Sequence, residues 1–245
     1  MARYITHAEF TCIGDRQINE DSAGVKEAGE KNCFVMCDGL GGHGMGDVAS
    51  SMVVSYFTEH FEQVEDMEEF IKCSFEGAQK QLLDEQQKRN IPKKMKTTAT
   101  VLTTDKKKAY IGYVGDSRVY VFNRNKVLVR TLDHSIPQML VMSGEITESE
   151  IRNHPDRNIL LRVMGAEWDG PAYELLKPVP LRKCQAMLLC SDGFWELIDE
   201  ACMCDCLKKS NSVEEWMAYM SEIVKINGKD KDMDNYTAVA VWVNK

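Results

Sequence analysis

Short runs of alternating or continuous apolar residues recur along the chain and predict β-strands. Eight such runs cover residues 4–13, 32–37, 99–104, 109–115, 118–123, 126–132, 186–190 and 237–243. Several are rich in β-branched or aromatic residues, as strands usually are. Tight connections such as Asn123-Arg124-Asn125 separate neighbouring runs. Strands joined in this way are typical of antiparallel hairpins rather than of alternating strand and helix units.

Helical periodicity is confined to separate blocks of the chain. Residues 47–90 carry apolar positions three and four apart in two segments, with Pro92 after the second, and a later block covers about 213–226. Runs of strands and runs of helices together predict an α+β fold with helices outside the sheets. The polar segment 135–165 contains a capping-box pattern at Thr147 and Glu150 and is expected to form a flap. No repeat or linker is visible, so residues 1–245 are expected to form a single domain.

Composition narrows the class of protein. The 245 residues carry a net charge of −8, which argues against a nucleic-acid partner, and no apolar run is long enough to cross a membrane. The N-terminal residues lack the apolar stretch of a secretory signal. Nine cysteines without a disulfide spacing predict reduced thiols in a cytoplasmic protein. Cys202, Cys204 and Cys206 do not have zinc-site spacing and are interpreted as small buried or half-buried side chains.

A glycine-rich stretch, DGLGGHG at residues 38–44, lies between an apolar run and a helical pattern. From Gly39 onward it matches the G-x-G-x-x-G pattern of dinucleotide-binding loops. Asp38 argues against that function, because a carboxylate at this point would repel a pyrophosphate. The second strand that such a unit needs is also missing from the sequence that follows. The stretch is therefore not expected to bind a dinucleotide. The acidic residue Asp38 indicates that it could lie close to a cation instead.

Acidic residues recur at the ends of the predicted strands. They are Glu20 and Asp21 beyond the first run, Asp38, Asp116 and Asp192 after three later runs, and Asp234 before the last run. Carboxylates gathered at one end of a sheet cannot all stay ionised unless cations balance them. Clusters made only of oxygen ligands select Mg²⁺ or Mn²⁺ rather than zinc. The glycine after Asp38 would let a backbone carbonyl approach such an ion.

An ordered series of motifs carries a family resemblance. The motifs are RQINED from Arg16, VMCDGLGGHGMGDVAS from Val35, KTTAT from Lys96, GDSRVY from Gly115, DHSIPQMLVMSGEIT from Asp133, LLCSDGFWEL from Leu188 and DNYTAVAV from Asp234. Together they resemble the metal-dependent protein phosphatases, the PP2C or PPM family, and most of all its compact bacterial-type domain. The resemblance extends from about residue 10 to residue 243. It implies two packed antiparallel sheets flanked by helices on both sides.

The resemblance also implies a role for each residue of the site. Asp38 would bridge two Mn²⁺ or Mg²⁺ ions, the Gly39 carbonyl would bind one of them, Asp192 and Asp234 would hold the other, and Asp116 would bind a third. Four residues would contact the ions through water, namely Glu20, Asp21, Thr98 and Glu196. Arg16 would grip the substrate phosphate, for which a forked guanidinium is well suited. The nucleophile would be a hydroxide that bridges two ions.

These features predict hydrolysis of phosphoserine and phosphothreonine in proteins, by a monomer that opposes a serine/threonine kinase. Two alternatives are a catalytically inactive phosphopeptide-binding module and an esterase for small phosphomonoesters. The first is disfavoured because Asp38, Asp192 and Asp234 are all present. Leu40 stands where some family members carry a histidine proposed as general acid, and His43 is expected only to shape the loop. His134 and His154 are expected at the surface.

Overall fold

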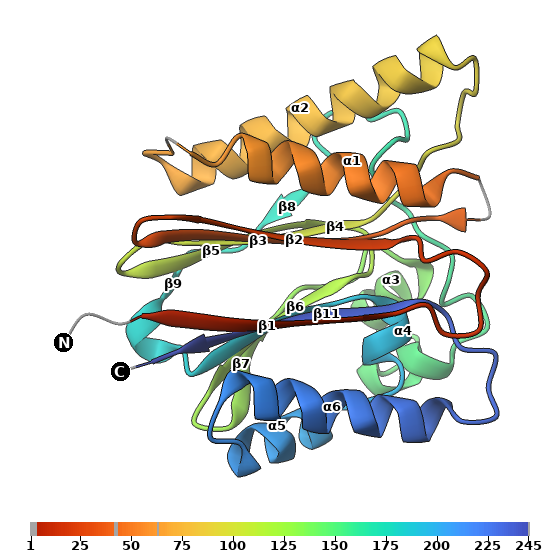
Figure 1. The fold of residues 1–245 in the computed structure, drawn as a ribbon. Coiled ribbons are helices and arrows are strands. Elements are labelled where there is room, and N and C mark those ends of the chain that lie inside the picture. Colours follow the sequence, from red (N-terminus) through yellow and green to blue (C-terminus); the bar gives the residue numbers. More distant parts are fainter. Residues whose placement is uncertain (1–3, 42–43, 63, 245) are drawn as a thin grey trace.

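The computed structural model describes residues 4–41, 44–62 and 64–244. Two antiparallel sheets lie face to face, with helices on both outer faces (Figure 1). The first sheet has the order β1 (Ile5–Cys12), β11 (Tyr236–Val243), β10 (Ala186–Cys190), β6 (Arg118–Asn123) and β7 (Lys126–Arg130). The second has the order β2 (Asp21–Ala28), β3 (Lys31–Asp38), β4 (Ala99–Thr104), β5 (Lys108–Val114) and β8 (Glu174–Leu175), with β9 (Val179–Pro180) also paired to β5. The expected α+β sandwich of four layers is therefore confirmed.

Each sheet has its own pair of covering helices (Figure 1). Helices α1 (Gly46–Glu59) and α2 (Met67–Lys88) pack on the second sheet, and α5 (Glu200–Lys209) and α6 (Val213–Gly228) pack on the first. Shorter elements are α3 (Ile136–Ser143), α4 (Asp192–Trp195) and the 3₁₀ turns η2 (Glu148–Asn153) and η3 (Leu181–Lys183). The predicted flap thus contains α3 and η2. Among the described residues, no helix is both long and apolar enough to span a membrane.

Among the helices of eight residues or more, the starts follow ordinary capping chemistry, with the exception of α1. The Asp66 carboxylate accepts hydrogen bonds from the first backbone N–H groups of α2, and the Ser212 hydroxyl accepts one from α6. Helix α1 instead begins after Met45, which has a left-handed backbone and no side-chain capping bond. The start of α1 must therefore be stabilised by a group from elsewhere in the chain.

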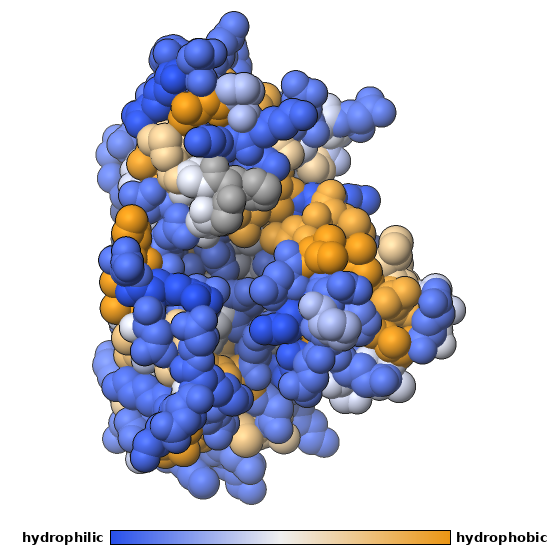
Figure 2. Space-filling view, turned by 90° about the vertical axis from the view of Figure 1, so that its right-hand side faces the viewer, coloured by the Kyte–Doolittle hydropathy of each residue, from blue (hydrophilic) through white to orange (hydrophobic). Residues whose placement is uncertain are grey.

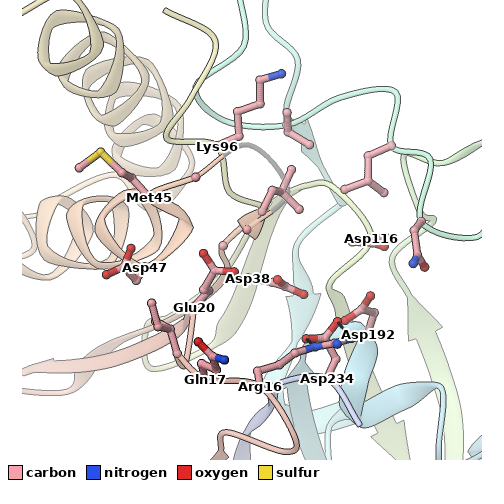
Figure 3. Close-up of a pocket in the computed structure, with 18 residues that line it drawn as sticks. Arg16, Gln17, Glu20, Asp38, Met45, Asp47, Lys96, Asp116, Asp192 and Asp234 are labelled. Carbon is pink, nitrogen blue, oxygen red and sulfur yellow. Dashed lines mark hydrogen bonds and ion pairs between the residues drawn. The ribbon is translucent and has the colours of Figure 1, made fainter. Parts of the chain in front are cut away.

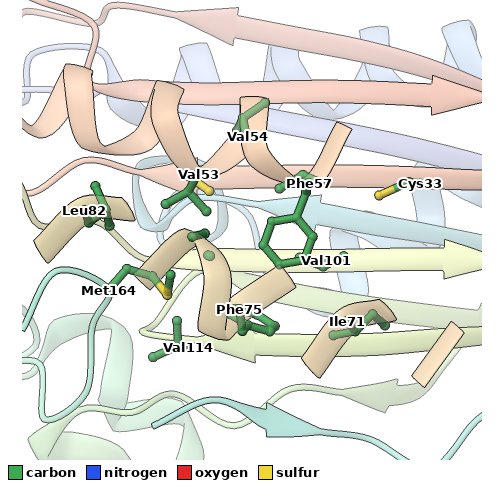
Figure 4. Packing of buried hydrophobic residues seen from close by; sticks show 14 of the residues in the cluster. Cys33, Val53, Val54, Phe57, Ile71, Phe75, Leu82, Val101, Val114 and Met164 are labelled. Atoms are coloured by element: carbon green, nitrogen blue, oxygen red, sulfur yellow. The ribbon is translucent and has the colours of Figure 1, made fainter. Parts of the chain in front are cut away.

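Strand β3 is buried on both faces, which explains its continuous apolar sequence. Phe34 and Met36 point into the layer between the two sheets, whereas Cys33 and Val35 point toward α1 and α2. On the helix side, Phe57 of α1 packs edge-on against Phe75 of α2 with ring centroids 5.1 Å apart (Figure 4). These cores hold β3 rigidly and so fix the position of the acidic residue at its end.

The sequence did not predict several of the elements, and the two longest of these are β2 and α5. Strand β2 reads DSAGVKEA, which is too polar to signal a strand, yet it pairs along its whole length with β3. Its Gly24 is required because a Cβ there would lie 2.6 Å from the Val54 side chain of α1. Helix α5 carries the three closely spaced cysteines, of which Cys206 is buried and the other two are half-buried. That exposure agrees with their interpretation as packing residues.

Candidate metal centre

Acidic side chains from both sheets meet at one end of the sandwich (Figure 3). They line a pocket of about 780 Å³. Six predicted site residues reach this pocket with their side chains, namely Arg16, Glu20, Asp38, Asp116, Asp192 and Asp234, and Gly39 lines it as well. Asp21, Thr98 and Glu196 lie behind this lining. The structure therefore brings the sequence-predicted residues together, although they span more than two hundred positions.

The strand ends explain this convergence. Asp38 is the last residue of β3, Asp116 follows β5, and Asp192 follows β10. Asp234 lies just before β11, which runs antiparallel to β10. In antiparallel strands, the end of one strand lies beside the start of its neighbour, so residues that follow β10 and precede β11 share one edge. The opposed packing of the two sheets then places both edges around the same pocket.

The aspartates repel one another in the absence of a balancing cation. Burial raises the pKa of Asp38 well above its ordinary value, and the charges of Asp192, Asp21 and Asp116 raise it further. The pKa values of Asp116 and Asp192 are raised first by burial and then by a neighbouring aspartate. The Asp38 and Asp192 carboxyl groups each affect the pKa of the other. Such an arrangement stores electrostatic free energy that a divalent cation would release.

Two further acids border the cluster. Burial raises the pKa of Asp21 to about 7, and the charges of Asp192 and Asp234 add to the effect. The Ser191 hydroxyl donates to Asp21 Oδ2 at 2.9 Å, whereas Oδ1 is buried without a hydrogen-bond partner among the described residues. Burial likewise raises the pKa of Glu196 to about 7, with the charge of Asp192 as the second cause. Both groups thus extend the excess of negative charge beyond the pocket lining.

Thr98 anchors the backbone of the residue at the centre of the site. Its side-chain Oγ1 accepts a hydrogen bond from the Asp38 N–H at 3.0 Å, and its own N–H donates to the Asp38 carbonyl at 2.8 Å. The same hydroxyl contacts Ser117 Oγ at 2.7 Å. Because Thr98 is fully buried, these bonds fix Asp38 from behind. Its expected contact with water on an ion stays a prediction.

The glycine-rich stretch wraps around a carboxylate and not a phosphate. The Glu20 carboxylate lies against the start of α1, where burial raises its pKa and the backbone N–H groups of Gly46 and Asp47 act to lower it, and it thereby supplies the negative group that this helix end favours. A Cβ on Gly41 would lie only 1.8 Å from Glu20 Oε2, and one on Gly46 would lie 2.7 Å from Oε1. The glycines are therefore needed so that the loop can approach Glu20. Gly42 and His43, and with them the expected role of His43, lie outside the described residues.

Arg16 lies at the mouth of the pocket and is bound to acids. Its Nε donates to Asp234 Oδ1 at 3.0 Å and its Nη2 to Oδ2 at 3.3 Å, which is a bidentate pair. Its Nη1 also donates to Asp232 Oδ2 at 3.0 Å. Figure 3 shows the guanidinium extending toward Asp234 and Asp192. A phosphate oxyanion that binds Arg16 must therefore compete with Asp234 for the guanidinium.

Asn235 belongs to the DNYTAVAV motif, but the sequence analysis assigned it no role, and the structure makes it a member of the site. Its Oδ1 accepts from the Glu20 N–H at 2.8 Å, and its Nδ2 donates to the carbonyls of Ile13 at 2.8 Å and Ile18 at 3.1 Å. It thereby fastens the loop that carries Arg16 and Glu20 to the start of β11. The asparagine directly after Asp234 was the only available signal, because its partners Ile13, Ile18 and Glu20 are more than 200 residues away in the sequence.

The flap borders the pocket with the apolar residues Leu160 and Val163. Figure 2 shows this end of the molecule, where a hydrophobic surface lies beside a hydrophilic recess. The large exposed apolar residues of the flap are Met139, Met142, Ile159 and Leu161. Arg157 of the flap also forms an ion pair of 3.0 Å with Glu196. The flap is therefore tied directly to the residues that follow Asp192.

The two flap histidines differ from each other. His154 is half-buried, and its Nδ1 accepts a hydrogen bond from the Asp156 N–H at 3.1 Å. His134 was expected at the surface, but only 7% of it is exposed. It is held between β5 and the flap by stacking on Tyr113. The surface interpretation of His134 is therefore wrong.

The donor set fits hard divalent cations. The candidate donors are the aspartate carboxylates that line the pocket and the backbone of Gly39, and oxygen ligands are the kind that Mg²⁺ and Mn²⁺ prefer. Across the part of the chain that the structure describes, no group of three or more acidic, histidine or cysteine side chains is arranged closely enough to hold a metal ion. Mg²⁺ keeps several water ligands and is commonly held through one or two carboxylates. The excess of buried negative charge is therefore a stronger indication of cation binding than the geometry of the side chains.

Comparison with known proteins gives the same assignment. The sequence profile of the family described as protein phosphatase 2C matches residues 11–236. The serine/threonine phosphatase Stp of Listeria welshimeri is 34% identical over 218 residues, which is 85% of this chain and 86% of that protein. The structure of Stp1 from Staphylococcus aureus superimposes with a TM-score of 0.90 at 29% identity, covering 98% of this chain and 96% of that one.

A more distant structure carries metal. The catalytic domain of the phosphatase PstP, solved in complex with two manganese ions, has a TM-score of 0.82 at 22% identity and covers 99% of this chain and 100% of that one. At this identity the likeness demonstrates the fold alone. The profile match nevertheless covers nearly the whole chain, and the relative from Listeria exceeds 30% identity over most of both sequences. The chain therefore belongs to the protein phosphatase 2C family.

Proposed function

We propose that the acidic pocket is the catalytic centre for removal of phosphate from phosphoserine and phosphothreonine in proteins. As a member of the protein phosphatase 2C family, the chain is a metal-dependent serine/threonine phosphatase and not a catalytically inactive module. The observation that carries the proposed site is the gathering of Asp38, Asp116, Asp192 and Asp234 in one pocket together with Arg16. A cluster of carboxylates beside one guanidinium is suited to bind cations and a phosphate ester together.

The proposed ligands of two Mn²⁺ or Mg²⁺ ions are Asp38, the Gly39 carbonyl, Asp192 and Asp234, and Asp116 is proposed to hold a third. Two such ions supply an activated water nucleophile and neutralise charge on the phosphoryl group. The manganese ions bound to PstP support a pair of ions in this family. Asp116 is suited to help hold a further ion, because burial raises its pKa and the charge of Asp192 raises it further, a cost that a cation would offset.

The chain's own residues position the ester. Arg16 has a forked set of donors that can bind two phosphoryl oxygens, once the phosphate displaces the Asp234 carboxylate. Because 40% of the Arg16 side chain is exposed, an incoming phosphate can reach it. Glu20 and Asp21 are proposed to orient water on the ions, and so are Thr98 and Glu196. Leu40 cannot transfer a proton, so Leu40 is not the general acid.

The partners, the cellular location and the oligomeric state are proposed from composition and from the fold as a whole. Phosphoprotein substrates imply a serine/threonine kinase that this protein opposes. The net charge of −8 argues against a nucleic-acid partner. The buried free thiols of Cys33, Cys37 and Cys190 support a reducing, cytoplasmic location. The two sheets share one core, which supports a single domain over residues 1–245 and a monomer as the working unit.

Phosphate release from a phosphothreonine peptide tests the proposal. We expect release with Mn²⁺ or Mg²⁺, no release without metal or after EDTA, and none from Asp192→Asn that keeps the wild-type circular dichroism. Phosphoserine as the free amino acid serves as a small phosphomonoester, and it should be hydrolysed much more slowly than the peptide. Equal rates on both would favour the small-molecule esterase. Full metal-dependent activity in Asp192→Asn would refute the ligand assignment.

A further inference from the structure

His134 lies between the acidic pocket and the flap. Its ring stacks on Tyr113 with centroids 5.0 Å apart and an interplanar angle of 18°. Its backbone N–H donates to the Gly115 carbonyl at 2.9 Å, and its carbonyl accepts from the Leu161 N–H at 2.8 Å. One residue therefore connects the turn that precedes Asp116 with the far end of the flap.

The ring makes a second bond to the same turn. His134 Nδ1 lies 3.2 Å from the Gly115 nitrogen and accepts its N–H. A nitrogen that accepts carries no proton, so the neutral ring has its proton on Nε2. Burial lowers the pKa of His134, which favours this neutral form. Nε2 lies 3.3 Å from Glu174 Oε1 but is not aligned for a hydrogen bond.

Gly115 has little freedom of its own. Its φ of +102° lies in the region that other residues rarely adopt, and a Cβ there would lie 2.6 Å from Thr98 Cγ2. Thr98 thus closes one side of the turn, and His134 binds both the N–H and the carbonyl of Gly115 from the other side. The next carbonyl, that of Asp116, accepts from Trp195 Nε1 at 3.0 Å. The polar backbone groups on either side of the Asp116 side chain are therefore fixed.

We infer that His134 is a positioning residue, whose unprotonated Nδ1 holds the Gly115 N–H and thereby sets the direction of the Asp116 carboxylate. The assignment of Asp116 to a metal ion rests on the proposed function, whereas the restraint on the turn does not. Because the His134 carbonyl also binds Leu161, a displacement of this part of the flap pulls on the same residue. The ring and the flap therefore act on Asp116 together.

Two substitutions separate the Nδ1 acceptor from the rest of the ring. The amide oxygen of asparagine falls near the place of Nδ1, so His134→Asn keeps an acceptor for Gly115. The amide of glutamine falls near Nε2, so His134→Gln faces Glu174 and leaves the Gly115 N–H without an acceptor. Both variants lose the stacking on Tyr113, which makes each the control for the other.

The first measurement is amide hydrogen exchange at Gly115 in metal-free protein, followed by NMR. We expect His134→Gln to speed this exchange roughly 10- to 100-fold, as for a buried donor that loses its acceptor. His134→Asn should stay within about threefold of wild type, since a hydrogen bond to an amide oxygen replaces the lost one. Equal acceleration in both variants would show that packing alone holds the turn and would overturn the inference, as would wild-type exchange in His134→Gln.

The second measurement is calorimetric titration with Mn²⁺ alone, with Asp116→Asn as the reference. His134→Gln should weaken the same Mn²⁺ binding event that Asp116→Asn removes, whereas His134→Asn should retain it. If Asp116→Asn changes no binding event, the third-ion assignment is wrong, and the Gly115 exchange still decides the positioning role. A loss in His134→Asn as large as in His134→Gln would overturn the role of the acceptor.

Discussion

The excess of buried negative charge can be tested at Asp21, which lies behind the pocket. Burial raises its pKa from 3.8 to about 7, mainly by desolvation. At a pH above both values, ionised Asp21 costs the folded state about 4 kcal/mol, because each pKa unit corresponds to about 1.4 kcal/mol. Asp21→Asn removes this cost and can still accept the Ser191 hydrogen bond. The variant should therefore be more stable than the wild type in metal-free protein.

The stability that Asp21→Asn gains is reduced by the fate of the second side-chain atom, Oδ1. Oδ1 of Asp21 is buried without a hydrogen-bond partner among the described residues, and the asparagine NH₂ would take its place. An unpaired buried donor costs about 1–2 kcal/mol, so the net gain at pH 8 is about 2–3 kcal/mol. For a chain of this length, that corresponds to a rise in Tm of roughly 5–10 °C.

The raised pKa of Asp21 also predicts how the stability difference between the variant and the wild type changes with pH. A carboxyl group whose pKa is raised on folding binds more protons in the folded state, so the wild type loses stability as pH rises from about 4 to about 7. The advantage of Asp21→Asn should therefore grow over this range and be close to zero near pH 5. Mn²⁺ should reduce the advantage at pH 8, because the ions balance the charge of the cluster.

Urea denaturation in EDTA at pH 5 and pH 8 measures these differences. Asp84→Asn, an exposed aspartate of α2, is the control and should change the free energy of unfolding by less than about 0.5 kcal/mol. An Asp21→Asn variant that is no more stable than the wild type at pH 8, or equally stabilised at pH 5, would refute the reasoning. Such a result would mean that solvent in the pocket already screens Asp21.

Three further predictions concern the parts that hold the site. Arg16→Ala should weaken competitive inhibition by inorganic phosphate about 10- to 100-fold, because a charge-assisted bidentate contact is lost. The affinity for Mn²⁺, measured by titration, should change less than threefold. A larger effect on Mn²⁺ binding than on phosphate binding would contradict the assignment of Arg16 to phosphate. Gly41→Ala should lower Tm by about 4–8 °C, since the new methyl group displaces the Glu20 carboxylate, and an unchanged Tm in a thermal melt would show that the loop can move away. Thr98→Val should cost about 1–3 kcal/mol in urea denaturation, because the Asp38 N–H loses its buried acceptor, and Thr98→Ser is the control that should keep most of the stability.

The electrostatics also bear on how a substrate enters. Arg16 is bound to Asp234, one of the proposed ligands, in a pair at the mouth of the pocket. A cation that binds Asp234 weakens this pair, and the freed guanidinium then has donors for a phosphoryl group. Metal and phosphate should therefore favour each other's binding, which a titration of phosphate with and without Mn²⁺ would reveal as a difference in affinity.

The sequence by itself determined the strand runs, the two long helices beside them and the family of the chain. Strand β3 could be predicted because a strand buried on both faces must be continuously apolar. The aspartates could be predicted because their position at strand ends is a local property. Strand β2 could not, since its polar sequence carries little strand preference and its pairing with β3 comes from a distant part of the fold.

Only the tertiary structure decided what each polar residue contacts. Gly41 and Gly46 surround Glu20, and Asn235 binds the loop after β1, although these partners lie far apart in the sequence. His134 is buried because the flap folds over it, which no local pattern records. Hydrogen bonds and buried charges depend on groups that approach one another in space, whereas hydrophobic periodicity depends on near neighbours along the chain. The sequence therefore determined which residues carry the chemistry, and the fold decided how they are held.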